Sequence, residues 1–233
     1  MDDLNLLIPD KLDPEREQVA EAWGKRNGRV IRLGRFWESP ALDASSVRVY
    51  GNDTFCLVLA QILKLKLVTP DDDLPLKVPT EYLRRKIVQS FVESASRIEY
   101  PCFVKSLVPK LFPSKVYHSA RDFHSVADGL EPNTPILVSE IVSIRSEVRS
   151  FILNNEVVTL NAYEGKADLN EARIFLKDFL ANASLTLPKT FVLDLAKLYD
   201  GSWVFLEANA TWGAGLNGCD PDRVVECIRA TVE

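Results

Sequence analysis

The chain has 233 residues, of which 46% are hydrophobic and 26% are charged, and this composition indicates a folded globular protein instead of a disordered one. Its net charge of -5 provides no general attraction for nucleic-acid phosphates, and its longest apolar run falls far short of the roughly 20 residues that cross a bilayer. We therefore expect neither a nucleic-acid partner nor a membrane span. The start Met-Asp-Asp lacks a signal-peptide pattern, and four cysteines without a CxxC pair predict reduced thiols, which favours a cytoplasmic location.

Short apolar segments alternate with helical patterns in the first part of the chain. Strands are predicted at residues 4–8, 30–33 and 47–50. Asp13, followed by a proline, is expected to start one helix, and Asn52 or Asp53 to cap a second. This alternation favours a small three-layer α/β unit with parallel strands.

A linker and a different pattern follow. The segment TPDDDLPLKVP, residues 69–79, suits neither helix nor strand because of its three prolines and three consecutive aspartates. Beyond it, Thr80 is expected to cap a helix that runs to about Ser94. Further strands are predicted at residues 101–107, 115–117, 136–142, 147–153 and 157–162. Capped helices are expected after Ser119, Asp168 and Asp220.

The segment FVLDLAKLYDGSWVFLEAN, residues 191–209, places polar side chains inside two apolar strands. Its Asp-Gly pair predicts a hairpin with a two-residue loop, and such a loop places Asp194 directly opposite Glu207. Since side chains alternate along a strand, Asn209 lies on the same face as Glu207. The opposite face of the hairpin is then wholly apolar.

Two carboxylates that face each other repel unless a positive charge lies between them. Mg²⁺ suits this set best, because it takes hard oxygen ligands from one or two carboxylates and completes its shell with water and phosphate oxygens; Mn²⁺ is the substitute. Asp194, Glu207 and Asn209 are therefore candidate metal ligands, and a nucleotide is implied. The alternative is a polar hairpin face that is simply exposed to water.

The hairpin resembles the end of the ATP-grasp fold, in which an Asp on one strand and a Glu-x-Asn on the next bind the magnesium ions of MgATP. Two upstream segments occur in the matching order. PCFVKS resembles the strand whose lysine reaches the nucleotide phosphates, which implies this role for Lys105. LVSEIVSIRSEVRSFIL resembles the hinge, so the backbone of Glu140, Ile141 and Val142 is expected to pair with adenine, and Glu147 to accept from the ribose hydroxyls.

Two cations are expected to act on the transferred phosphoryl group. Arg149 lies two residues after Glu147, so in a strand both side chains share a face, and the guanidinium fork can hold phosphate oxygens or developing charge. Lys115 opens the return strand and is implied to place its ammonium group over the phosphates. For Lys110, a position over the phosphates and a solvated surface position are equally favoured. With these groups the chain most resembles a small bacterial and phage clade of ATP-grasp domains named for its arginine and two lysines.

The resemblance covers about residues 80–219 and implies a division of the chain. We expect an α/β (α+β) protein in which residues 1–78 form a pre-ATP-grasp domain and residues 79–233 the ATP-grasp domain, its lid at about 79–138 and its core at about 139–233. Arg84 and Arg85 lie where relatives carry a phosphate-contacting basic residue, although surface charge is the favoured interpretation.

The segment after the hairpin, ATWGAGLNG, resembles the turn that lies near the acyl substrate in relatives. Gly213 and Gly215 are weak candidates for residues that line the substrate site. Trp212 is either a platform for the substrate or a core residue. Lys166 is a further, weaker candidate for a position near substrate.

The resemblance implies an ATP-dependent carboxylate-amine ligase, acting on an amino acid or a peptide through an acylphosphate intermediate. Two alternatives stay open: a nucleotide-binding module that uses ATP as a regulatory ligand, and a small-molecule kinase of the same fold. The expected partners are ATP, Mg²⁺ and the small substrates, with a homodimer as the candidate assembly.

Overall fold

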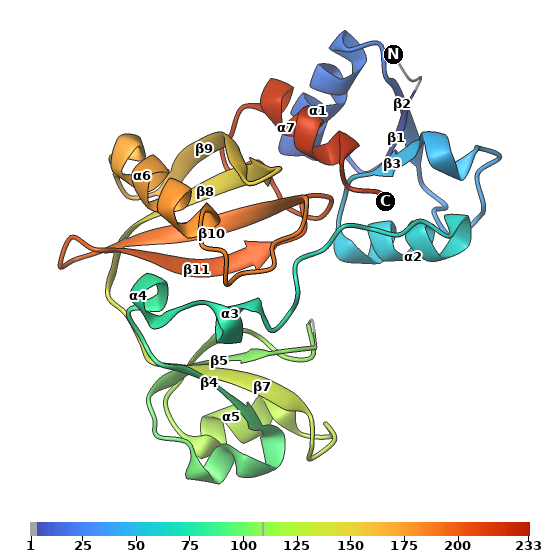
Figure 1. The fold of residues 1–233 in the computed structure, drawn as a ribbon. Coiled ribbons are helices and arrows are strands. Elements are labelled where there is room, and N and C mark those ends of the chain that lie inside the picture. Colours follow the sequence, from blue (N-terminus) through green and yellow to red (C-terminus); the bar gives the residue numbers. More distant parts are fainter. Residues whose placement is uncertain (1–3, 109) are drawn as a thin grey trace. The chain divides into compact units, whose positions relative to one another are not determined.

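The computed structural model describes residues 4–108 and 110–233, which fall into two compact units (Figure 1). The first unit contains the chain up to Pro70 together with Arg145–Lys197 and Phe205–Glu233, and the second contains Asp71–Ile144 and Leu198–Val204. The chain therefore passes from one unit to the other four times. The division into domains at residues 78 and 79 stays a prediction. No helix in the described residues is long and apolar enough to span a membrane.

A three-stranded parallel sheet forms the start of the first unit, as the alternating pattern predicted. Its strands are β1 (Asn5–Pro9), β2 (Arg29–Leu33) and β3 (Val47–Val49), in the order β2-β1-β3. Since successive side chains of β1 point to opposite faces, Leu6 packs into one hydrophobic cluster and Leu7 into another. Both faces of this sheet are therefore covered, as in a three-layer α/β unit.

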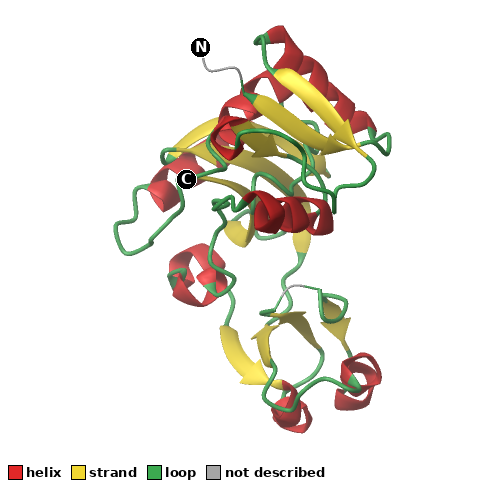
Figure 2. Ribbon diagram, turned by 90° about the vertical axis from the view of Figure 1, so that its right-hand side faces the viewer, coloured by secondary structure: helices red, strands yellow, loops and turns green. Residues whose placement is uncertain are grey.

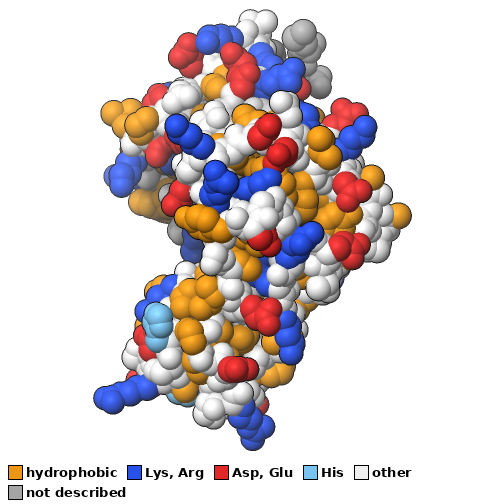
Figure 3. All heavy atoms as spheres, turned by 90° about the vertical axis from the view of Figure 1, so that its left-hand side faces the viewer, with side chains coloured by type: hydrophobic (Ala, Val, Ile, Leu, Met, Phe, Trp, Pro, Cys, Tyr) orange, Lys and Arg blue, Asp and Glu red, His pale blue; other side chains and the backbone are white. Residues whose placement is uncertain are grey.

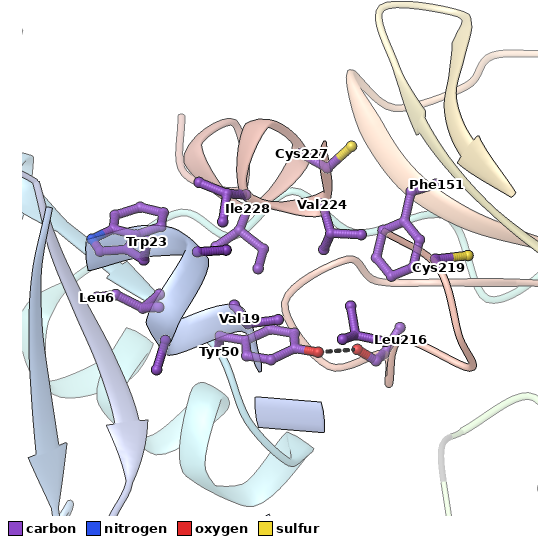
Figure 4. Packing of buried hydrophobic residues seen from close by; sticks show 14 of the residues in the cluster. Leu6, Val19, Trp23, Tyr50, Phe151, Leu216, Cys219, Val224, Cys227 and Ile228 are labelled. Carbon is purple, nitrogen blue, oxygen red and sulfur yellow. Dashed lines mark hydrogen bonds between the residues drawn. The ribbon is translucent and has the colours of Figure 1, made fainter. Parts of the chain in front are cut away.

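The helices on these faces begin at the residues that the cap signals indicated. They are α1 (Pro14–Lys25), α2 (Asp53–Leu63) and α7 (Pro221–Arg229), with a 3-10 turn η1 (Ala44–Ser46) before β3. The side chain of Asp13 accepts from the backbone of α1, and those of Asn52 and Asp220 do the same for α2 and α7. Helices α1 and α7 share the cluster around Trp23, Tyr50 and Phe151 that Figure 4 shows.

A second sheet in the first unit carries the acidic hairpin. Its strands are β8 (Ile144–Leu153), β9 (Glu156–Glu164), β10 (Thr190–Leu198) and β11 (Trp203–Asn209), in the order β11-β10-β8-β9. Helix α6 (Leu169–Leu180) packs against it, with the ring of Phe179 stacked on that of Phe205 at a centroid distance of 5.6 Å. Strand β10 is buried along almost its whole length, so a charged side chain on it is withdrawn from water.

The turn of this hairpin is longer than the two-residue loop that the Asp-Gly pair predicted. The backbone N–H of Gly201 donates to Leu198, and that of Leu198 donates to Ser202, so the loop has three residues. Gly201 takes a positive φ of 88°, as in the bulged three-residue turn. The register inferred from a two-residue loop is therefore wrong at the turn.

The second unit is built on an antiparallel sheet. Its strands are β4 (Ile87–Phe91), β5 (Cys102–Ser106), β6 (Lys115–Tyr117) and β7 (Pro135–Ser139), in the order β4-β7-β5-β6. One face of the sheet buries Val104 and Tyr117 against the 3-10 helix η2 (Val92–Arg97) and the helix α5 (Ala120–Ala127). Figure 2 shows these two helical segments on one side of the strands.

The predicted helix from Thr80 to Ser94 is wrong. A single turn, α4 (Thr80–Leu83), is followed by Arg84 in the left-handed region at a φ of 47°, and the chain then enters strand β4. Pairing with β7 supplies the ladder that overrides the helical pattern. The preceding segment, expected to be irregular, contains one more short helix, α3 (Leu74–Lys77).

The basic residues at the end of α1 and in β2 are matched by acidic ones. Lys25 pairs with Glu21, and Arg32 with Glu17. Figure 3 likewise shows acidic and basic side chains interspersed on the face that it draws. This part of the surface therefore presents mixed charge instead of a basic patch.

Candidate active site

The acidic face of the hairpin is present in the first unit. Asp194 lies on β10, and Glu207 and Asn209 lie on β11. The Asn209 amide donates to Glu207 Oε1 at 3.1 Å and is 3.4 Å from Asp194 Oδ2. The three side chains thus converge in spite of the longer turn, and one amide group reaches both carboxylates.

A guanidinium group holds Asp194 where the sequence led us to expect a metal ion. Arg149 Nε donates to Asp194 Oδ1 at 2.9 Å, and Nη2 donates to Oδ2 at 2.6 Å, in a two-bond fork. The side chains are 13% and 2% exposed, respectively. Burial raises the pKa of the Asp194 carboxyl, and the guanidinium opposes that shift. Arg149 therefore compensates a buried negative charge, which the sequence did not reveal.

The donor set still fits a hard divalent cation. Among the described residues, no group of three or more His, Cys, Asp or Glu side chains is arranged for a metal. Here, however, the third donor is the amide oxygen of Asn209. Asp194 Oδ1 keeps a further lone pair after its hydrogen bond to Arg149, whereas Oδ2 accepts from both Arg149 and Asn209. Glu207, the Asn209 oxygen and Asp194 Oδ1 are oxygen donors of the type that Mg²⁺ selects.

Glu147 has a partner that the sequence analysis missed. The Tyr163 hydroxyl on β9 donates to Glu147 Oε2, and the Tyr163 ring lies 5.8 Å from the guanidinium carbon of Arg149. Burial and this hydrogen bond raise the pKa of Tyr163, so its phenol stays protonated and remains a donor. Glu147, Arg149 and Tyr163 therefore form one cluster. Tyr163 comes from the neighbouring strand β9, so no local spacing in the sequence pointed to it, and the candidate Lys166 is exposed.

The loop after β11 is partly core. Trp212 is 5% exposed, and its indole N–H lies 3.1 Å from the carbonyl of Val68. This places Trp212 in the core, the second of the two predicted alternatives. The backbone N–H of Gly213 donates to Ala210. The carbonyl of Gly215 accepts from Arg149 Nη1 at 3.0 Å, so this glycine reaches the acidic cluster through its backbone.

The two predicted phosphate lysines lie on opposite faces of the sheet in the second unit. Lys115 is paired with Val104, and directly paired residues share a face, so its side chain emerges on the face that packs against α5. There it lies 3.5 Å from Asp122 and 4.8 Å from the centre of the Tyr117 ring. Lys105 follows Val104 and points to the other face. The structure does not bring the two lysines together.

Lys105 interacts with the exposed Asp72 and shares its face of the sheet with Ser139, the partner of the buried Arg85. Its charge lowers the pKa of Asp72, although burial raises that pKa more. Arg85 is 8% exposed and donates to the hydroxyl of Ser139, which lies on the same face as Lys105. Burial lowers the pKa of Arg85 to about 10. The interpretation of Arg85 as surface charge is therefore wrong.

The hinge segment is partly engaged by the chain itself. The Glu140 N–H donates to the carbonyl of Lys86 at 3.0 Å, and the Lys86 N–H donates to Glu140 Oε2 at 2.8 Å. The carbonyl of Glu140 accepts from the hydroxyl of Ser139. Ile141 is 47% exposed, and Val142 is half-buried. Pairing with an adenine edge is therefore better suited to the backbone of Ile141 and Val142 than to that of Glu140.

Solved structures show the same fold. A RimK domain ATP-grasp protein from Sphaerobacter thermophilus is 16% identical, with a TM-score of 0.62 over 95% of this chain and 97% of that chain. An N5-carboxyaminoimidazole synthase from Aspergillus clavatus, in complex with ADP and 5-aminoimidazole ribonucleotide, is 10% identical, with a TM-score of 0.62 over 97% of this chain and 77% of that one. D-alanine–D-alanine ligase from Bacillus anthracis is 9% identical, with a TM-score of 0.57 over 98% and 97%.

A comparison with curated proteins gave no match. A family model does match: it describes family 2 of the ATP-grasp clade named for one arginine and two lysines, and it covers residues 82–227. This span includes the hinge, the Arg149 cluster and the acidic hairpin. The chain has the ATP-grasp fold and belongs to family 2 of this arginine-and-two-lysine clade of ATP-grasp domains.

Proposed function

We propose that the protein is an ATP-dependent carboxylate-amine ligase, which activates the carboxylate of an amino acid or peptide as an acylphosphate and passes it to an amine. The observation that carries this proposal is the Arg149 fork on buried Asp194, beside Glu207 and Asn209. This arrangement combines a fixed cation for phosphate oxygens with oxygen donors for a metal, and phosphoryl transfer needs both.

Glu207, Asn209 and Asp194 are the residues that would hold Mg²⁺, with Mn²⁺ as the substitute. When bound, the ion supplies positive charge that neutralises phosphate oxygens. The low exposure of Asp194 supports this role, because a carboxylate that is fixed by packing and by hydrogen bonds needs little reorganisation when it binds a cation.

Arg149 is assigned to the oxygens of the transferred phosphoryl group. Its Nε and Nη2 are oriented by Asp194, and Nη1 by the carbonyl of Gly215, so the plane of the guanidinium is determined before any substrate binds. A planar donor group held in this way stabilises developing charge without a reorganisation cost.

The remaining groups are assigned to nucleotide binding. Glu147 would accept from the ribose hydroxyls, and the Tyr163 hydroxyl orients its carboxylate. Lys105 is assigned to the phosphates and the backbone of Ile141 and Val142 to adenine. The phosphate role predicted for Lys115 lacks support from its position on the packed face.

The relatives support ATP and carboxylate substrates. One solved relative is described as a complex with ADP, and another as a D-alanine–D-alanine ligase. The four cysteines, which are all free thiols in the structure, agree with a reducing compartment, and we propose the cytoplasm. A homodimer stays a prediction that analytical ultracentrifugation can test.

The test is a screen of amino acids and short peptides for ADP release, followed by mass spectrometry of the product. A ligase releases ADP only with both a carboxylate and an amine, and its product has lost one water relative to the two substrates. A product that has gained a phosphate identifies a kinase instead. Nucleotide binding without ADP release under any pair of substrates identifies a regulatory module.

A further inference from the structure

One peptide group in the loop after β11 is bonded at both ends by charged side chains. The carbonyl of Gly215 accepts from Arg149 Nη1 at 3.0 Å. The N–H of Leu216, which belongs to the same peptide group, donates to Glu15 Oε2 at 2.9 Å. In a planar trans peptide, N–H and C=O point in opposite directions, so a carboxylate and a guanidinium lie at the two ends of one rigid dipole.

The Glu15 carboxylate is itself held at two points. Besides the Leu216 N–H, it accepts the N–H of Asn217, on Oε1 at 2.7 Å. Glu15 lies in the first turn of α1 and is half-buried. A Cβ atom added to Gly215 would lie 2.6 Å from Glu15 Oε2, so the close approach of the carboxylate requires a glycine at this position.

The rest of the loop is fixed by neutral hydrogen bonds. Tyr50, at the end of β3, donates its hydroxyl to the carbonyl of Ala214 at 2.9 Å, and Figure 4 shows this bond beside Leu216. The amide of Asn161, on β9, donates to the carbonyl of Asn217 at 2.9 Å. The peptide group that links Glu15 to Arg149 therefore has little freedom to rotate.

We propose that Glu15 is a positioning residue for Arg149 and acts through the Gly215–Leu216 peptide group. The inference rests on the proposed function, because the orientation of Arg149 affects turnover only when Arg149 acts in phosphoryl transfer. The negative charge at the N–H end and the positive charge at the C=O end polarise the peptide in the same sense, which strengthens both hydrogen bonds. Through Glu15, helix α1 thereby orients Nη1 of Arg149.

The experiment measures the position of Arg149 independently of turnover. In the ¹⁵N-labelled full chain, the Nε–H signal of Arg149 is identified by its loss in Arg149→Lys. Glu15→Ala is expected to shift or broaden this signal, and Glu15→Gln, whose carboxamide can accept only one of the two N–H groups, to shift it less. Glu17→Gln is the matched control, since Glu17 lies in the same helical turn but pairs with exposed Arg32.

Turnover supplies the second measurement. Glu15→Ala should lower kcat for ADP release by about 10-fold to 100-fold, as a misplaced catalytic group does, while KM for ATP changes by less than about twofold. Gly215→Ala should reproduce this loss, because its methyl group displaces the Glu15 carboxylate. The double variant should be no worse than either single variant, since both break one link.

An unchanged Arg149 signal in both Glu15→Ala and Gly215→Ala would overturn the proposal. The proposal would also be overturned if Glu15→Ala shifted the Arg149 signal but had the same kcat as the Glu17→Gln control. If the unsubstituted chain releases no ADP with any substrate, the proposed function fails, and the Nε–H signal still decides whether Glu15 orients Arg149.

Discussion

The two units hold their candidate residues in different ways. In the first unit, Asp194 is 2% exposed at its side chain and is bonded through both oxygens to Arg149, which is itself bonded to the Gly215 carbonyl. In the second unit, the side chain of Lys115 is 48% exposed and lies 3.5 Å from a surface aspartate. Arg149 and Asp194, which are assigned to chemistry, are therefore buried and oriented, whereas Lys115, whose predicted phosphate role lacks support, is solvated.

This difference has a physical reason. Charge stabilisation in a transition state depends on dipoles and cations that are already oriented, and burial with several hydrogen bonds provides that orientation. A group that only attracts a nucleotide can be flexible, because long-range attraction depends little on its exact geometry. Substitutions in the first unit should consequently have larger effects on stability and turnover than substitutions in the second.

The largest effect is expected for Arg149→Ala. It leaves the Asp194 carboxylate buried without its guanidinium, which should lower the free energy of unfolding by about 3 to 5 kcal/mol, and ADP release should be lost. Urea denaturation measures the first effect. The control is Arg26→Ala, which removes the exposed pair with Glu226 and should cost less than about 1 kcal/mol. Equal losses in the two variants would remove the contrast between buried and exposed pairs.

Glu207→Gln should keep the fold and lower Mg²⁺-dependent ADP release by at least about 100-fold, because the amide lacks the charge that holds the cation. Thermal denaturation checks the fold, and Mn²⁺ binding followed by electron paramagnetic resonance checks the site. Glu226→Gln, at the surface pair with Arg26, is the matched control. Full activity of Glu207→Gln would show that this carboxylate binds no catalytic ion.

The two lysines of the second unit should differ. Lys105→Ala should raise the Kd for ATP about 10-fold, the loss of one charge-assisted contact, while Lys115→Ala should change it by less than about twofold, since its partners are Asp122 and Tyr117. Isothermal titration calorimetry compares them directly. A larger effect of Lys115→Ala than of Lys105→Ala would contradict the assignment of Lys105 to the phosphates.

A smaller effect is expected at Glu147. Glu147→Ala should raise KM for ATP more than it lowers kcat, as for a group that binds substrate and transition state equally. Tyr163→Phe should give the same pattern with a change in KM of about fivefold, because it removes one hydrogen bond of about 1 kcal/mol. Steady-state kinetics at varied ATP separate the two parameters. A loss confined to kcat would argue against a ribose contact.

Local signals predicted the elements of the first unit well. Asp13, Asn52 and Asp220 cap helices in the structure because an N-cap needs only its own side chain and the next backbone amides. Strand β4 was missed, because its partner β7 lies more than 40 residues further along the chain and only the pairing decides between helix and strand.

The candidate site was predictable in part for the same reason. Alternation along β11 was enough to group Glu207 with Asn209, whereas the grouping with Asp194 was inferred from a two-residue loop and is kept in the structure with a three-residue loop. The partners Tyr163 and Glu15 come from other elements, so no local spacing pointed to them. The face of Lys115 depends on the pairing of β5 with β6, which the loop between them sets.

The three-residue turn at Gly201 has a practical consequence. Two of the four passages of the chain between the units, at Lys197–Leu198 and Val204–Phe205, lie on the two arms of this hairpin. Tyr199 at the tip is 72% exposed, and such tips accept inserted peptides. A fluorescent label at this position would lie in the second unit, at the tip of the hairpin whose strands carry Asp194 and Glu207. Such a label leaves the acidic residues unaltered, so a change in its fluorescence on addition of ATP tests whether the surroundings of the tip respond to the nucleotide.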